Sequence, residues 1–356
     1  MPAPRPTNPR TNRAGANQGA QAPRPERPAE EQGEDVESCP IATDARQLTR
    51  MVAMIWNPRA VVNAGYELRR AADDGSEQAI RDAASATQKL NHKLYDKLNE
   101  LQPDLFDQLA DKDGHFARYV RDRLSRGRSG AKAEDNHKVK NALPHLVKDR
   151  WLPSLIDVAK KDRGLAHDEC AKWLSPNTIN WDDADAHVLL DSDDRDPEDP
   201  RKGLMRNKLL IDVAKVLLKS PTSVIPSATV RPNAVRRGRK GVGAKYQLTE
   251  ITPAFLAYVA VLTRFAVSSE ETYSDDGGTF NYAEFYKQLR EFLEMPKYRR
   301  HSKVLINFWN KEIFPDVARG ANGGVIDNDI RAGGTLELID AQYEGEDDDD
   351  EGEGAN

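Results

Sequence analysis

The sequence predicts a mainly α-helical protein, with a single multi-helix globular domain and disordered N- and C-terminal tails. Three observations support this fold class. Residues 253–267 are apolar on nearly every side and carry one charge, on Arg264, and a helix that is apolar all round is buried. Helical spacing of apolar residues recurs before and after this segment. Both chain ends are polar and offer little that a core can bury.

The segment 248–315 contains the longest apolar run and is expected to be the structural centre. Thr252 precedes a proline, which is a pattern typical of a helix start. Asn281 is expected to cap a second helix, with Glu284 at its N3 position and Phe280 packed on Phe285. A third helix is expected to end at Pro315, with its apolar side formed by Val304, Leu305, Phe308, Trp309 and Ile313.

The rest of the ordered chain also has helical spacing. The ordered part of the chain is expected to begin near residue 43. We expect four helices there: one that ends at 56, one over 58–70, one over 76–101 with Ser76 as its cap, and one from 105 through 120. Residues 121–140 are polar and strongly charged and contain Gly127 and Gly130, so they are expected to form an exposed loop. Helical spacing resumes over 143–159 and again over 204–218, where Ser220 and Pro221 end it.

Composition sets the domain boundaries. Residues 1–42 form a tail rich in Pro and Arg, residues 43–318 the helical domain, and residues 319–356 a linker rich in Gly and Asn followed by an acidic tail. Within the domain, residues 43–102 are N-terminal helices. The acidic tail has eight Asp and Glu residues between positions 344 and 353. Such a dense acidic block repels itself and is expected to be disordered.

Composition also bounds the class of protein. Of the 356 residues, 38% are hydrophobic and 31% are charged, with a formal net charge of −6. Two cysteines, Cys39 and Cys170, do not make a disulfide framework. No apolar run is long enough to cross a bilayer, and no signal sequence is recognisable. We expect an intracellular protein, nuclear or cytoplasmic, with no membrane partner and no cofactor.

A basic loop precedes the central apolar helix. Residues 231–245 contain six basic residues, no acidic residue and three glycines. Clustered cations attract phosphate or serve as a nuclear import signal. The candidate binding residues are Arg236, Arg237, Arg239, Lys240 and Lys245.

Several motifs with metal-ligand spacing are weak. Asp275 and Glu284 match two positions of a calcium-binding EF-hand loop, but two other carboxylate ligands are missing, and helix capping already accounts for Glu284. His167 and Cys170 have the spacing of a zinc pair, but no second pair exists. A structural histidine beside a buried thiol is the preferred interpretation. The sequence therefore predicts no metal site.

An acidic turn supports an alternative hypothesis. Residues 191–199 contain six acidic residues, and carboxylates that hold a divalent metal can hydrolyse phosphate esters. If His167, Asp196, Glu198 and Asp199 meet in one cleft, the protein is a metal-dependent hydrolase or nuclease.

The order of short motifs resembles an uncharacterised family from mushroom-forming basidiomycete fungi, known only as a domain of unknown function. The resemblance covers about His92 to Val317, so residues 103–318 are the family-like core. It rests on runs at Arg128–Ala131 with Asp135 and Lys138, Arg163-Gly164 with His167, Asn180-Trp181, Asp196–Pro200 with Gly203-Leu204, Lys219–Val224, Ile251–Pro253, Tyr258–Ala260, Arg264–Ala266, Ser268-Ser269, Phe285-Tyr286, Phe308–Asn310 and Ile313–Pro315.

Two positions depart from the family pattern. Ser175 stands where such proteins tend to have a cysteine, and Arg201 stands where they tend to have an aromatic residue. The missing cysteine argues against a shared thiol nucleophile. Because the family has no established activity, the resemblance implies no catalytic residues.

The molecular function is therefore unknown from sequence. The preferred hypothesis is a non-enzymatic helical interaction module, nuclear and associated with nucleic acid through the basic loop, with a protein partner as the other possibility. The acidic tail is expected either to keep the protein soluble or to suppress binding by folding back over the basic loop.

Overall fold

Helices form all the regular structure in the described part of the chain. The computed structural model describes residues 39–111, 114–175, 189–193, 203–225, 241–276 and 278–315. Within these ranges the α-helices are α1 Pro40–Met51, α2 Pro58–Asp74, α3 Glu77–Ala83, α4 Ala86–Leu101, α5 Leu105–Asp111, α6 Gly114–Leu146, α7 Asp168–Leu174, α8 Lys208–Leu218, α9 Val242–Lys245, α10 Pro253–Val267, α11 Tyr282–Glu294 and α12 Arg299–Ile313. The mainly α prediction is confirmed.

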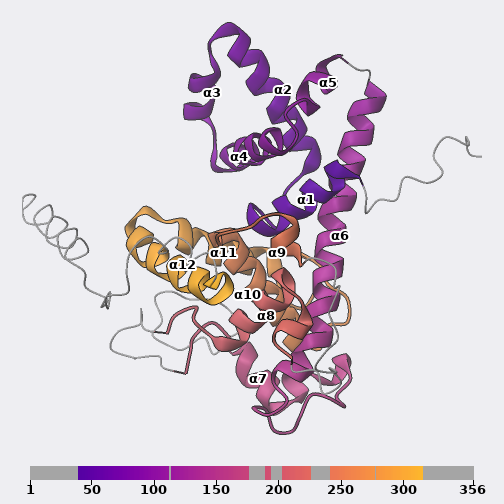
Figure 1. Ribbon diagram of the computed structural model, residues 1–356, viewed down its shortest axis with the longest axis vertical. Coiled ribbons are helices and arrows are strands. Elements are labelled where there is room, and N and C mark those ends of the chain that lie inside the picture. The colour runs from indigo at the N-terminus through magenta and orange to yellow at the C-terminus, as the bar shows by residue number, and fades with distance from the viewer. Residues whose placement is uncertain are drawn as a thin grey trace, which may run out of the picture.

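Helix α6 connects the two ends of the domain. Figure 1 shows α6 running along one side of the molecule, with α2 to α5 at one end and α7, α8 and α10 to α12 beside its other half. Helix α1 crosses α6 near its middle. Apolar residues form one core cluster among α1, α2, α4, α5 and the first half of α6, and a larger one around α10. These clusters lie in a single helical domain.

The exposed loop predicted for residues 121–140 is wrong, because this segment lies inside α6. The buried side of α6 is hard to recognise in the sequence because it includes small and polar residues. Gly127, Ala131 and Asp135 are buried there along with apolar residues. A Cβ atom added at Gly127 would lie 2.3 Å from the main-chain oxygen of Ala42. Gly127 is therefore required for the close crossing of α1 and α6.

The single helix predicted over 76–101 is also wrong. The chain breaks at Ala84, which has extended backbone angles, and α4 begins after Ser85. Ser85 and Gln88 form a complete capping box, which fixes this new start. Similarly, α5 ends at Asp111 and α6 begins at Gly114 rather than forming one helix, while residues 147–159 form turns after α6.

The central helix matches its prediction. Helix α10 spans Pro253–Val267, and every residue from Ala254 onward is buried. The Thr252 hydroxyl accepts a hydrogen bond from the Phe255 N–H at 3.1 Å. At its other end, the Lys160 ammonium donates to the Phe265 carbonyl at 2.7 Å, and Arg163 donates to the Ala266 carbonyl at 3.0 Å. Side chains thus bind backbone groups at both ends of this buried helix.

The next two helices also match in position. The Asn281 side chain accepts a hydrogen bond from the Glu284 N–H at 2.9 Å, and the Phe280 and Phe285 rings lie 5.5 Å apart. The last helix, α12, ends at Ile313, two residues before Pro315. In the described residues, none of the helices has the length and apolar character that crossing a membrane requires.

Candidate functional site

A cavity rich in basic side chains lies between α1, α6, the end of α8 and α9. Its volume is about 520 Å³. We call it the basic pocket. Its walls carry one acidic residue, Glu134, and five basic residues: Arg46, Arg50, Lys138, Lys219 and Lys245.

A buried ion pair builds the inner wall of the basic pocket. Arg50 donates to the two Asp135 carboxylate oxygens at 2.6 and 3.0 Å, and Tyr258 donates to the same carboxylate at 2.9 Å. Asp135 is fully buried, and Arg50 is 2% exposed. Burial opposes the charge on Arg50, but the Asp135 carboxylate outweighs it, and the pKa of Arg50 is raised. Arg50 therefore stays charged where α1 crosses α6.

Glu134 joins two cations at the rim. Arg46 donates to one Glu134 oxygen at 2.6 Å, and Lys138 donates to the other at 2.6 Å. Partial burial raises the pKa of Glu134, but the contact with Lys138 outweighs it and the net shift is downward. Arg50 also lies 3.6 Å from Glu134, and Lys138 lies 3.9 Å from Asp135, so two carboxylates face three cations. The rim keeps an excess of positive charge.

Lys219 and Lys245 complete the pocket from the other side. Lys219 is the C-cap of α8, and Lys245 is the last residue of α9. A Cβ atom at Gly241 would lie 2.4 Å from the Lys219 carbonyl oxygen, so only glycine lets α9 approach α8 this closely. Both lysines are exposed, and in the described part of the chain neither has a carboxylate within 4.0 Å, although the Asp44 carboxylate lies near enough to interact electrostatically with Lys245. They are the cations most available to an incoming anion.

Tyr246 closes the pocket floor. Its hydroxyl donates to the Thr43 carbonyl at 3.1 Å, which connects the α9 segment to α1. Burial raises the pKa of Tyr246, so the phenol stays neutral and adds no negative charge to the cavity.

The structure places only part of the basic loop. Lys245 lies in the basic pocket, whereas Arg236, Arg237, Arg239 and Lys240 lie outside the described residues. The sequence did not identify the four other cations of the basic pocket, namely Arg46, Arg50, Lys138 and Lys219. They come from three other helices, and no local spacing links them.

Of the four residues in the alternative hydrolase hypothesis, the structure describes only His167. Asp196, Glu198 and Asp199 lie outside the described residues. The His167 Nε2 atom lies 3.1 Å from the Pro153 carbonyl, and its Nδ1 atom accepts from the Cys170 N–H at 3.5 Å as the cap of α7. His167 and Cys170 are both buried. These contacts agree with a structural histidine beside a buried thiol.

The two EF-hand-like residues take part in other contacts. The Asp275 carboxylate binds the Lys132 ammonium at 2.6 and 2.9 Å. Glu284 lies in the first turn of α11, and its N–H is bound by the cap residue Asn281. Across the described ranges, no group of three or more His, Cys, Asp or Glu residues is arranged to hold a metal ion.

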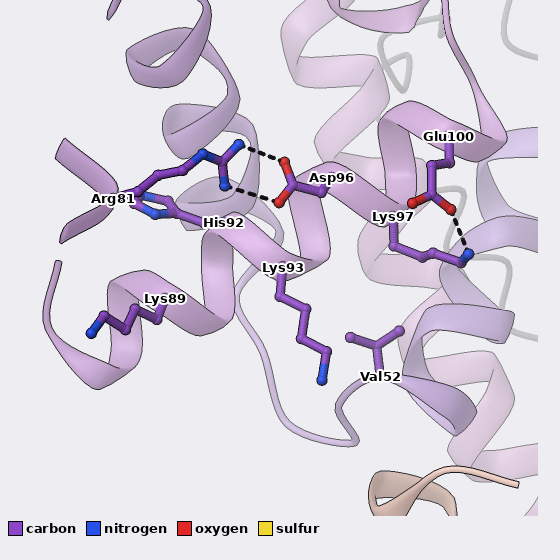
Figure 2. Close-up of a pocket in the computed structure, with 8 residues that line it drawn as sticks. All are labelled: Val52, Arg81, Lys89, His92, Lys93, Asp96, Lys97 and Glu100. Carbon is purple, nitrogen blue, oxygen red and sulfur yellow. Dashed lines mark hydrogen bonds and ion pairs between the residues drawn. The ribbon is translucent and has the colours of Figure 1, made fainter. Parts of the chain in front are cut away.

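A second cavity, of about 480 Å³, lies beside α4. Figure 2 shows Arg81 facing Asp96, Lys97 facing Glu100, and Lys89 pointing away from both acidic residues. Arg81 donates to both Asp96 oxygens at 2.8 and 2.9 Å, and Lys97 donates to Glu100 at 2.5 Å. Because its carboxylates neutralise adjacent cations, this cavity offers less free positive charge than the basic pocket.

Comparison with known proteins finds one family. The sequence model described as "Family of unknown function (DUF6698)" matches residues 126–314. This match includes α7 to α12 and most of α6, and with them Glu134, Lys138, Lys219 and Lys245 of the basic pocket. No curated protein and no solved structure matches the chain.

Proposed function

Since that match spans just over half of the chain, the protein belongs to the DUF6698 family of unknown function, and we propose that it is a non-enzymatic helical interaction module that binds nucleic-acid phosphates through the basic pocket. The observation that carries this proposal is the convergence of five cations from four segments on one cavity that holds a single carboxylate. The order of sequence motifs favours a basidiomycete fungal origin.

Phosphate is the anion that suits this arrangement. Arg50 is held rigidly by Asp135, while Lys219 and Lys245 are exposed and have no carboxylate partner in the described part of the chain. Arg50 is buried and contributes positive charge to the wall, whereas the two exposed lysines and the partly exposed Arg46 and Lys138 can contact successive phosphates of a nucleic-acid backbone. Contacts to backbone phosphates contribute affinity because they release condensed counterions. They do not distinguish one base sequence from another, because every nucleotide carries the same phosphate.

The chain sequence extends the positive charge beyond the pocket. Residues 231–240 add five basic residues directly before Gly241, which lines the basic pocket. The same run fits the composition of a nuclear import signal. We therefore propose that the protein acts in the nucleus, and accumulation of a fluorescent fusion in the nucleus of a fungal cell measures this part of the proposal.

The proposal is tested by fluorescence anisotropy with a labelled DNA duplex and a matched single strand over a range of salt concentrations. We expect salt-sensitive binding by the full chain. In the double variant Lys219→Gln, Lys245→Gln, the magnitude of the slope of log affinity against log salt should fall by about 1.4–1.8, since each lost phosphate contact lowers it by roughly 0.7 for a single strand or 0.9 for a duplex.

The matched control removes two charges from the other cavity. Lys89 and Lys93 are exposed on α4, and replacing both by glutamine changes the net charge by the same amount. This control should retain the salt slope of the unmodified protein. An equal loss in both double variants would overturn the proposal, because the binding would then follow net charge alone. Equally tight binding of poly-glutamate would reassign the partner to an acidic protein.

A further inference from the structure

Ser220 joins the basic pocket to a Ser-Pro dipeptide. The exposed turn after α8 reads Lys219-Ser220-Pro221-Thr222-Ser223 and carries three hydroxyl groups. Ser220 lines the basic pocket, and it is the hydroxyl residue that directly precedes the proline. Thr222 and Ser223 lie beyond it, on the exposed 3₁₀ turn. Two separate features, pocket and motif, thus coincide at Ser220.

The backbone presents this serine to a modifying enzyme. Ser220 has φ −176° and ψ 161°, the extended conformation that a residue before proline prefers. Its hydroxyl lies 2.9 Å from the Thr222 hydroxyl, and that contact is exposed. Ser220 itself is half-buried, and the three residues that follow it, Pro221, Thr222 and Ser223, are exposed. Ser220 itself is extended, whereas Pro221–Ser223 form a 3₁₀ turn that hydrogen-bonds back to the Ser220 carbonyl. A proline-directed protein kinase would therefore bind this surface turn after it opens.

We propose that Ser220 is a phosphorylation site and that its phosphate occupies the basic pocket. The kinase transfers the γ-phosphoryl group of ATP. A bond forms between the Ser220 oxygen and the γ-phosphorus, the bond from that phosphorus to the oxygen bridging the β-phosphate breaks, and ADP leaves. The hydroxyl proton passes to the base of the kinase.

Electrostatics favours the phosphate at this place. A phosphoserine carries about −1.5 to −2 charges at pH 7 and offers three strong acceptor oxygens. The C-terminal end of α8 opposes it with the equivalent of roughly −0.5 charge. Lys219 precedes Ser220 in the chain, and Lys245 and Arg46 line the same cavity with full positive charges. The cations therefore outweigh the helix end, and the phosphate neutralises the charges offered to a nucleic acid.

The first experiment treats the full chain with a proline-directed kinase and ATP and maps the phosphate by mass spectrometry. The sequence holds another exposed serine before a proline, Ser175, so the experiment is done in a Ser175→Ala background. There we expect a phosphate on Ser220 that is absent when Ser220→Ala is added. In anisotropy, the phosphorylated protein should bind the labelled duplex about tenfold more weakly than the untreated protein. The matched controls are Thr222→Glu and Ser223→Glu, which add charge outside the pocket and should weaken binding much less.

A second readout separates this inference from the proposed function, on which its consequence for binding rests. The second pKa of the phosphate, measured by phosphorus NMR, should lie below the ordinary value of about 6 because of the adjacent cations. In phosphorylated Lys245→Gln it should rise toward that value. An ordinary pKa in both proteins, or phosphorylation at Thr222 or Ser223 instead, would overturn the inference. A lowered pKa without DNA binding would overturn the proposed function alone.

Discussion

Asp135 is the residue on which the crossing of α1 and α6 depends. Its carboxylate is fully buried and accepts hydrogen bonds from Arg50 on α1 and from Tyr258 on α10. One side chain thus connects three helices. Removing one partner of a buried pair is costly because the other charge is left uncompensated. The pair holds Arg50 in the wall of the basic pocket, so this contact serves both the fold and the candidate site.

Replacing Asp135 by asparagine should therefore lower the free energy of unfolding by about 3 kcal/mol or more. The loss arises because the buried Arg50 guanidinium loses the carboxylate that binds it directly and keeps only Glu134, 3.6 Å away, as a weaker counter-charge. Urea unfolding followed by circular dichroism measures it. Glu134→Gln is the matched control: its side chain is 40% exposed, and the expected loss is below about 1 kcal/mol. Similar losses in the two variants would show that burial of Asp135 does not set the cost.

Residues of the candidate site differ in how well the sequence reveals them. Lys245 belongs to a run of basic residues without an acid, and composition alone identifies it. Arg46, Arg50 and Lys138 lie in helical segments of mixed charge, and each is close to an acidic residue in the sequence or the fold. Composition therefore does not identify them. Their convergence on Lys245 depends on how α1 crosses α6. Sequence spacing carries no information about that crossing.

At the scale of elements, α10 and α6 explain what is predictable. Helix α10 has large apolar residues on all sides and clear caps, so its bounds follow from local rules. Helix α6 packs on its neighbours through Gly127, Ala131 and Asp135, and its glycines and dense charge favour a loop when the segment is considered locally. Their burial comes from tertiary contacts with α1, which override propensity. The bounds of a strongly apolar helix can therefore be predicted from sequence, whereas a helix that packs closely through small residues is missed.

A pair of glycines in α6 tests this account. Gly127→Ala should destabilise the protein by roughly 1–3 kcal/mol, because its Cβ atom meets backbone of α1 at 2.3 Å. Gly130→Ala places its Cβ atom 3.0 Å from the flexible end of Arg46. There the gain in helix propensity, about 1 kcal/mol, should leave stability unchanged or higher. Urea denaturation of both variants measures the difference, and equal effects would contradict the close-approach role of Gly127.

At the scale of the whole molecule, charge is separated along the chain. The formal net charge is −6, yet the basic pocket and residues 231–240 are strongly positive, and eight acidic residues lie between positions 344 and 353. Like charge on a protein slows its encounter with nucleic acid over distances of about a Debye length or less. The acidic tail should therefore oppose the binding that the pocket favours, whether it acts at a distance or by direct contact.

Deleting residues 344–356 removes eight negative charges from a net of −6 and leaves +2. We expect DNA affinity to rise about tenfold at low salt and the gain to shrink as salt screens the tail. Anisotropy titrations across salt concentrations measure this. A tail of equal length with Asn and Gln in place of Asp and Glu separates charge from length, and it should behave like the deletion.

Combining the deletion with Lys219→Gln, Lys245→Gln distinguishes contact from long-range repulsion. If the tail occupies the basic pocket, its removal gains little once those lysines are gone, and the two changes are not additive. If the tail acts only through the field of the whole molecule, the gains and losses add. A deletion that leaves affinity unchanged at every salt concentration would show that the acidic tail has no part in binding.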